Sequence, residues 1–327
     1  MGRFWRVFSA VLTLALLGLF VLGILNMQAI EDWLRLRNYE PPATITRIVR
    51  ADRMTKNAER IFYITHPELI GSADTFRQNC PTIEQTIVLG CYRSGLNTGI
   101  YIYNIDDSRL NGVVEVTAAH EMLHAAYDRL SQNEQQRVNE LLNDYYTNDL
   151  KDKRIIETID SYKKSEPTEL INEMHSIFAT EIRNLPTELE AYYQKYFNQR
   201  SAVVSFAERY GDEFTRRINK IKDYEQQLAA LKKKIASEES ALAGKLSKIE
   251  SDRRNLNSLR ASGQVAAYNA AVDDFNTEVE NYNSAVNRLK DGIAEFNRLV
   301  AAHNALASEL RSLYDSLDTS LKPQSEQ

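Results

Sequence analysis

A long heptad pattern constrains this chain more than any other feature of its sequence. From Ile221 an apolar residue returns at every seventh position. After a break at 261–263, apolar residues at alternating spacings of four and three run from Tyr268 to Leu317. Heptads sustained in this way predict coiled-coil helices. Because one break separates two arms of about 50 residues, we expect an antiparallel helical hairpin over residues 205–319 with its tip near 261–263.

The second arm also carries asparagine at a period of seven, each time directly after an aromatic residue or a histidine. Asparagine is a poor helix former, so its repetition needs an explanation. Two remain open, a solvated face beside the apolar seam or a polar ladder that faces a partner. A coiled-coil protein partner is therefore one expectation. The residues are Asn269, Asn276, Asn283, Asn297 and Asn304.

An uncharged apolar run occupies residues 7–25. A helix over this run rises about 28 Å, close to the ~30 Å hydrocarbon core of a bilayer. Two arginines precede the run and two acidic residues follow it, which predicts a cytoplasmic segment 1–6 and an extracytoplasmic remainder. The run is longer than that of most signal peptides, and Met27 fits a cleavage site poorly. We expect an uncleaved, single-pass signal anchor in the cell membrane, with a cleaved signal peptide as the alternative.

The composition excludes several classes of protein. A hydrophobic content of 43% is too high for a disordered chain, and 12 Gly with 7 Pro exclude a collagen-like one. The net charge of -5 gives no sign of nucleic-acid binding. The two cysteines, Cys80 and Cys91, would lie in an oxidising compartment, where we expect a disulfide; two free thiols or a metal role are the alternatives.

The segment between the anchor and the hairpin predicts an α+β domain over residues 43–204. We expect a juxtamembrane stalk before it, over 26–42, and a disordered tail after the hairpin, over 320–327. Within the domain, strands are predicted early and helices later. The elements expected are a helix within 43–58, a strand at Arg60–Ile64, a helix capped by Thr65, strands at Thr86–Leu89 and Gly99–Ile105, and helices from Gly112 onward.

The motif that carries chemistry is the pentapeptide from His120 to His124, which has the H-E-x-x-H form. On a helix, residues four apart share a face, so both imidazoles can hold one ion. Zinc suits such a site because it lowers the pKa of a bound water to about 7. Glu121 would lie beside the ion, where its carboxylate could take a proton from that water and pass it to a leaving amine.

Residues 117–126 resemble the extended active-site helix of the zincin metallopeptidases. Tyr127 and Leu130 stand where the metzincin branch has glycine and its third histidine, so that branch is excluded. Residues 171–178 are similar to the third-ligand helix of the thermolysin-like gluzincins. The resemblance implies a zincin-like catalytic domain in which His120, His124 and Glu173 hold zinc.

The resemblance is incomplete at one place. Gluzincins have an Asp four residues after the ligand Glu to orient a zinc-bound imidazole, and here that residue is Ile177. Glu181 is the candidate replacement, either in that orienting role or as the third ligand. His175 is a candidate catalytic group, since gluzincins often use a His or Tyr to stabilise the oxyanion, or a ligand. Glu173 itself has an alternative as an ordinary carboxylate at a helix start.

Together these features predict a membrane-anchored, extracytoplasmic zinc metallopeptidase that hydrolyses peptide bonds by zinc-activated water. Its substrate would be a peptide or protein, and the strand at Gly99–Ile105 could pair with it by strand addition. The alternative is a non-enzymatic envelope protein, in which the coiled coil mediates interactions and the zincin-like domain is structural or inactive. An inhibitor or sensor module that binds zinc is a variant of that alternative. The presence of Glu121 favours the enzyme, because a purely structural zinc site has no use for it.

Overall fold

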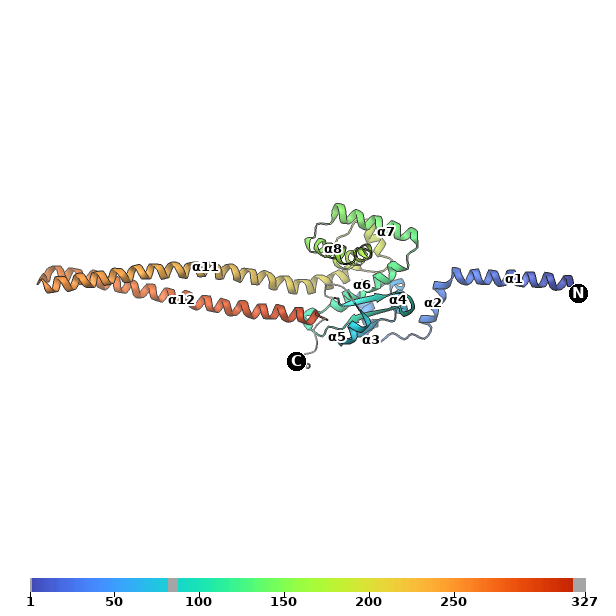
Figure 1. The fold of residues 1–327 in the computed structure, drawn as a ribbon, viewed down its shortest axis with the longest axis horizontal. Coiled ribbons are helices and arrows are strands. Elements are labelled where there is room, and N and C mark those ends of the chain that lie inside the picture. Colours follow the sequence, from blue (N-terminus) through green and yellow to red (C-terminus); the bar gives the residue numbers. More distant parts are fainter. Residues whose placement is uncertain (1, 82–87, 320–327) are drawn as a thin grey trace. The chain divides into compact units, whose positions relative to one another are not determined.

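The computed structural model describes residues 2–81 and 88–319 (Figure 1). The chain is mostly helical, with a small three-stranded sheet and a long helical hairpin toward its C-terminus. It divides into two units, which we call the globular unit (to Gly211, and again from Asp315) and the hairpin unit (Asp212–Tyr314). The expected combination of a small sheet, helices and a helical hairpin is confirmed at this level. The tail at 320–327 lies outside the described residues.

The N-terminal segment forms two helices, α1 (Gly2–Leu25) and α2 (Met27–Leu36). Within the described part of the chain, no helix taken alone is apolar over a length that would cross a membrane. Leu12–Ile24 and Met27–Leu36 are long and apolar enough only when they are taken together, and the two helices are bent by 66° relative to each other. The stalk expected over 26–42 is largely helical, and its buried Asp32 forms ion pairs with Arg60 and Arg129 of the globular unit.

The sheet has the order β1-β3-β2. Strand β3 (Gly99–Tyr103) is central, parallel to β1 (Glu68–Ile70) and antiparallel to β2 (Gly90–Arg93). Strands β2 and β3 thus form a hairpin, and Gly95 in its turn has a φ of +87°. The expected substrate-pairing role of Gly99–Ile105 is wrong, because both edges of β3 are already paired.

Two short elements differ from the predictions. Arg60–Ile64 is part of helix α4 (Lys56–Ile64), because Thr55 caps that helix and Ala58, Ile61 and Phe62 bury one helical face. Thr65 ends α4 instead of starting a helix. The strand expected at Thr86–Leu89 begins later, at Gly90, and residues 86 and 87 lie outside the described part of the chain.

Cys80 and Cys91 form a disulfide, as expected. It joins the end of helix α5 (Ala73–Asn79) to strand β2. The bond therefore ties the edge strand to a helix that also contacts β1 and β3.

The core of the globular unit surrounds helix α6 (Val113–Asp128). Gly112 starts α6 with a φ of +105°, and a Cβ there would lie 2.8 Å from Cβ of Phe206. Helix α6 packs against α9 (Leu170–Glu181), against β2 and β3, and against α3 and α4. The remaining elements of the unit are α3 (Ala43–Ala51), α7 (Gln132–Asp144), the π-helical turn Tyr145–Asp149, α8 (Lys153–Ser165) and α10 (Thr187–Tyr193).

Arg200 fixes the C-terminal end of α9. Its guanidinium is almost fully buried and donates to the carbonyl oxygens of Phe178, Ala179, Ile182 and Arg183, and it also pairs with Glu190. The last carbonyls of a helix have no partners within the helix. One side chain thus satisfies several of them and sets where α9 ends.

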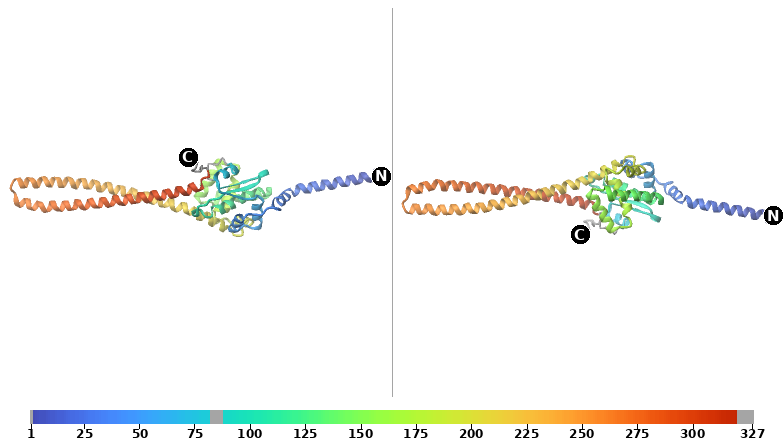
Figure 2. Two further views of the ribbon diagram at one scale, coloured as in Figure 1. Left: turned by 90° about the horizontal axis from the view of Figure 1, so that it is seen from below. Right: turned by 90° about the horizontal axis from the view of Figure 1, so that it is seen from above.

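The hairpin unit consists of two long antiparallel helices that run side by side in both views of Figure 2. They belong to α11 (Arg200–Ala261) and α12 (Val265–Leu317), with Gly263 at a φ of +73° in the tip. Ion pairs between the arms straddle Gly263 at nearly equal sequence distances, which gives the register. They are Lys248–Glu278, Arg217–Glu309 and Glu225–His303. The five asparagines of the repeat are all exposed.

Candidate metal centre

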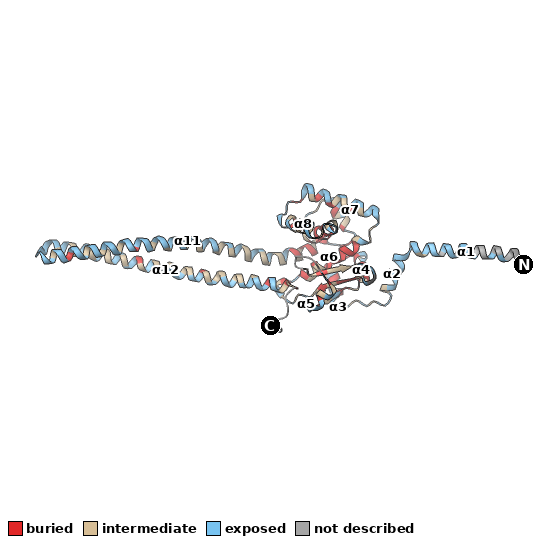
Figure 3. Ribbon diagram, in the orientation of Figure 1, coloured by how far each residue is buried: buried red, intermediate tan, exposed pale blue. Residues whose placement is uncertain are grey.

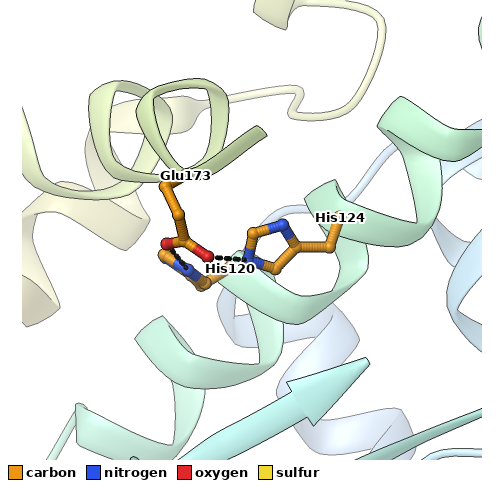
Figure 4. Close-up of side chains that lie close together, drawn as sticks. All are labelled: His120, His124 and Glu173. Atoms are coloured by element: carbon orange, nitrogen blue, oxygen red, sulfur yellow. Dashed lines mark ion pairs between the residues drawn. The ribbon is translucent and has the colours of Figure 1, made fainter. Parts of the chain in front are cut away.

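Helix α6 carries His120 and His124 one turn apart, so both rings lie on the same side of the helix (Figure 4). The two ring centroids are 4.7 Å apart. The helix forms here because Val113 to Ala126 contains no Gly or Pro and buries nearly every apolar side chain. Its surroundings are therefore packed tightly enough to hold the two rings in place.

Helix α9 brings the carboxylate of Glu173 to the same place. Its Oε2 lies 3.4 Å from Nε2 of His120, and its Oε1 lies 3.4 Å from Nε2 of His124. The three side chains offer ligand atoms that all lie within 4.8 Å of one another. Two imidazoles and one carboxylate are one of the donor sets found in catalytic zinc sites. The structure thus brings together the three predicted ligands.

The three side chains of the centre shift one another's pKa. Burial opposes a charge on Glu173, yet the charges of His124 and His120 and a hydrogen bond from Tyr162 keep its pKa below the usual range. Burial also lowers the pKa of His124, whereas at His120 the hydrogen bond and charge of Glu173 outweigh burial and raise the pKa. A bound metal ion would replace protons on these side chains, because the ligands of a metal must be deprotonated.

Two further observations fit a metal. Among the residues that the structure describes, Oε2 of Glu173 is buried and makes no hydrogen bond of good geometry, although Nε2 of His120 lies 3.4 Å away. A buried acceptor of this kind is costly unless something else satisfies it. Oγ of Ser176 lies 3.5 Å from Nδ1 of His124, which leaves Nε2 facing Glu173. A hydrogen bond at the far nitrogen is the usual way in which a metal-binding imidazole is oriented.

Glu121, the residue after His120 on α6, lies against strand β2. A Cβ on Gly90 would come within 2.8 Å of Cγ and 2.9 Å of Oε1 of Glu121, and within 2.5 Å of Cγ2 of Thr117. Only glycine leaves room for this approach. Gly90 was not among the residues predicted from the sequence, although a glycine in a strand can mark a close approach of the backbone.

The three ligand side chains and Glu121 line one cleft of about 500 Å³. Its other lining residues come mainly from β2, α6, α8 and α9 and from the segments next to them. None of its described lining residues is Lys or Arg, so its charge is acidic. The ionisable lining residues are Tyr92, His120, Glu121, His124, Asp128, Tyr162, Glu166, Glu169, Glu173, Glu181 and Tyr210.

Glu181 lines the same cleft but is not one of the three grouped ligands. Its Oε2 accepts a hydrogen bond from Nη1 of Arg154, at 2.5 Å, and its charge helps to raise the pKa of His120. Its observed partner is thus a cation from α8. Glu181 thus lies outside the ligand group, and its expected role in orienting an imidazole stays a prediction.

His175 lies away from the cleft. Its ring is fully buried, its Nε2 lies 2.9 Å from the hydroxyl of Tyr192, and it contacts the rings of Tyr127, Tyr193 and Tyr196. Burial, with the charges of His124 and His120, lowers its pKa to about 3. A neutral ring in this aromatic cage cannot reach a substrate, so the catalytic role expected for His175 finds no support. Helical geometry already indicates that the His175 side chain points away from the metal centre, because His175 lies 200° around the helix from Glu173.

Tyrosines line the cleft where the sequence analysis had named none. Tyr162, on α8, is hydrogen-bonded to Glu173, and Tyr92, on β2, is hydrogen-bonded to Asp128. Tyr210 also lines the cleft, and burial raises its pKa. No local pattern marks these residues, because their elements meet only in the folded unit.

Comparisons with protein-family models, with curated proteins and with solved structures find no match to this chain.

Proposed function

We propose that this protein is a zinc-dependent metallopeptidase, anchored in the membrane by its N-terminal segment and exposed outside the cytoplasm. One observation carries the proposal. The ligand atoms of His120, His124 and Glu173 lie within 4.8 Å of one another and line a cleft that also contains Glu121. A purely structural zinc site is closed by four protein ligands, whereas a catalytic one has three and leaves a position open.

His120, His124 and Glu173 would hold the metal. When bound, zinc supplies Lewis acidity, which polarises a carbonyl oxygen and lowers the pKa of water toward 7. Glu121 would accept the proton of the attacking water and donate it to the leaving amine. Its place against Gly90 fixes this carboxylate at the cleft wall. Tyr162 would keep Glu173 in position through its hydrogen bond.

Strand β2 is the best surface for an extended peptide. Among the described residues it pairs only with β3, and Gly90, Cys91 and Tyr92 line the cleft. A peptide added to this edge would gain backbone hydrogen bonds and would pass beside Glu121. The disulfide from Cys91 to Cys80 holds the edge strand in place.

The rest of the chain would serve location and recruitment. The apolar run at 7–25 would anchor the protein, with residues 1–6 in the cytoplasm. An oxidising compartment suits the disulfide. The hairpin unit carries no part of the cleft, so we assign it to positioning or to a protein partner.

The test is a cleavage assay with the full chain in lipid nanodiscs and a random library of quenched fluorescent peptides. Glu121→Gln should lower the rate by at least about 10²-fold, because the general base is lost while the metal ligands remain. Glu169→Gln is the matched control, since Glu169 lines the same cleft but is exposed. It should change the rate by no more than a few-fold. Equal rates for the parent and Glu121→Gln would contradict the proposal.

A further inference from the structure

Helix α2 exposes its apolar side and turns its polar side toward the domain, which is the reverse of an ordinary surface helix. Its apolar side chains are exposed: Met27 (66%), Ile30 (47%), Trp33 (60%) and Leu34 (48%). The spacing of these residues places them on one side of the helix. The four form one apolar surface, which we call the α2 face. An exposed apolar surface that includes a large aromatic residue marks an interaction site.

The opposite side of α2 is polar and contacts the rest of the globular unit. Asp32 is buried and pairs with Arg60 of α4 and with Arg129, the residue after α6. Arg35 donates from Nε to the carbonyl oxygen of Ile64 and from Nη2 to that of Thr98, both at 2.6 Å. These contacts fix the rotation of α2, so the α2 face must point away from the domain.

The chain itself suggests what covers the α2 face. One residue, Asn26, separates α2 from α1, which ends the apolar run of the proposed anchor. The face therefore begins where that anchor would leave the hydrocarbon. The two helices are bent by 66°, and a tilt of about 20° for the spanning helix, which is average, would bring α2 close to the bilayer plane.

The side chains at the border of the face also suit an interface. The guanidinium of Arg37 lies 5.5 Å from the ring centre of Trp33. Tryptophan is enriched at the level of the lipid headgroups, and an arginine beside it can reach the phosphates. An apolar side with tryptophan and leucine, next to arginines, is the pattern of helices that lie in a membrane surface.

We infer that α2 lies in the outer surface of the membrane, with the α2 face in the lipid and the opposite side fixed to the globular unit. The inference rests on the proposed anchor and extends it. The protein then has two contacts with the bilayer, one spanning and one lateral, instead of a flexible tether. Because Asp32 and Arg35 hold the domain to α2, the cleft has a fixed orientation relative to the membrane.

Tryptophan fluorescence tests this directly, since the chain has only two tryptophans. The full chain with Trp5→Phe retains Trp33 as its single reporter, and is placed in phosphatidylcholine vesicles with lipids brominated near the headgroup. We expect about a twofold loss of Trp33 emission relative to unbrominated vesicles. A variant with Trp5→Phe, Trp33→Phe and Leu246→Trp reports from an exposed position of the hairpin unit and should show no loss.

A second pair of variants separates the inference from the anchor. Trp33→Phe leaves Trp5, which reports on α1. Quenching of Trp5 without quenching of Trp33 would overturn the inference and leave the anchor intact. Quenching of neither would overturn both. A blue-shifted Trp33 that brominated lipid does not quench would show a protein or a second copy on the face, which also overturns the inference.

The exposed positions allow a further check. Ile30→Gln with Leu34→Gln, in the Trp5→Phe background, removes apolar area without touching Asp32 or Arg35. The loss of Trp33 emission in brominated vesicles should then fall to within about a tenth of that of the Leu246→Trp control. Unchanged quenching of Trp33 would show that the α2 face does not hold the helix in the lipid, and would contradict the inference.

Discussion

Two helix pairs in this protein, α6 with α9 and α11 with α12, are built on opposite principles. Figure 3 shows the contrast between α6, which is largely buried, and α11 and α12, which are mostly exposed or half-buried. Where α6 meets α9, both helices are largely buried, and polar groups such as Glu121, Glu173 and Thr180 are buried with the apolar ones. Along the hairpin unit most residues are exposed or half-buried, and the few buried ones are apolar, such as Leu242, Leu256 and Leu299.

The difference separates a contact that includes groups costly to bury, at α6 and α9, from a contact that stabilises the fold, in the hairpin. Burying carboxylates and imidazoles is unfavourable unless they are paired, and apolar residues of similar size would often be more stable. The α6–α9 contact therefore has a purpose other than stability. The hairpin, by contrast, repeats the same kind of apolar contact many times, so no single residue in it should be critical for stability.

The largest effect should come from the core beside the site. Phe178→Ala removes a fully buried ring that packs against Tyr145, and should cost about 3–5 kcal/mol of stability. The matched change in the hairpin is Phe296→Ala, a half-buried seam residue, which should cost about 1–2 kcal/mol. Hydrogen exchange measured by mass spectrometry resolves each region. Equal losses of protection at the two places would break the comparison.

Arg200→Met should have the next largest effect. It leaves the last carbonyls of α9 and the carboxylate of Glu190 without their buried donor, which costs about 3 kcal/mol. Denaturant unfolding measures the loss. Arg183→Met is the control, because its pair with Glu208 is exposed, and its unfolding midpoint should stay where it is. A neutral Arg200→Met would mean that α9 ends where it does for another reason.

Gly90→Ala should damage chemistry more than stability. The new methyl group would push Glu121 and Thr117 from strand β2, and a displacement of about 1 Å at a catalytic group can lower the rate by 10²-fold. Zinc content should stay unchanged, because no ligand moves. Gly71→Ala is the control, with no atom within 4 Å of the added Cβ. Full activity in Gly90→Ala would remove Glu121 from its assigned role.

The smallest effect concerns the substrate. The cleft has six carboxylates and, among its described residues, no Lys or Arg, so cationic peptides should be favoured. We expect peptides with Lys or Arg near the scissile bond to be cleaved several-fold faster than those with Asp or Glu, and the preference should shrink at high salt. A preference for acidic peptides at low salt would show that another surface selects the substrate.

How much the sequence predicted depended on the length of each pattern. The hairpin and its tip followed from heptads sustained over many turns. His120 and His124 followed from one helix, on which spacing fixes the geometry. Arg60–Ile64 was wrong as a strand, because a short run of four apolar, β-prone residues fits a buried helix equally well, and the cap at Thr55 favours the helix.

The parts of the site that the sequence did not reveal come from distant segments. Glu173 was named through a resemblance, and its distance from the histidines could only be seen in the folded chain. The contacts of Gly90 with Glu121 and of Tyr162 with Glu173 join separate elements, so no local spacing encodes them. The structure gives no support to the role expected for His175, because the ring is buried in an aromatic cage that comes largely from Tyr192, Tyr193 and Tyr196, on α10 and just after it.

The most direct test of the account is the zinc content of the full chain after dialysis, measured with two variants. We predict about one zinc per chain in the parent and in Glu181→Ala, and little in Glu173→Ala. Loss of zinc in Glu181→Ala but not in Glu173→Ala would show that Glu181, and not Glu173, is the third ligand. A folded parent that binds no zinc would contradict the central claim that His120, His124 and Glu173 form a metal centre.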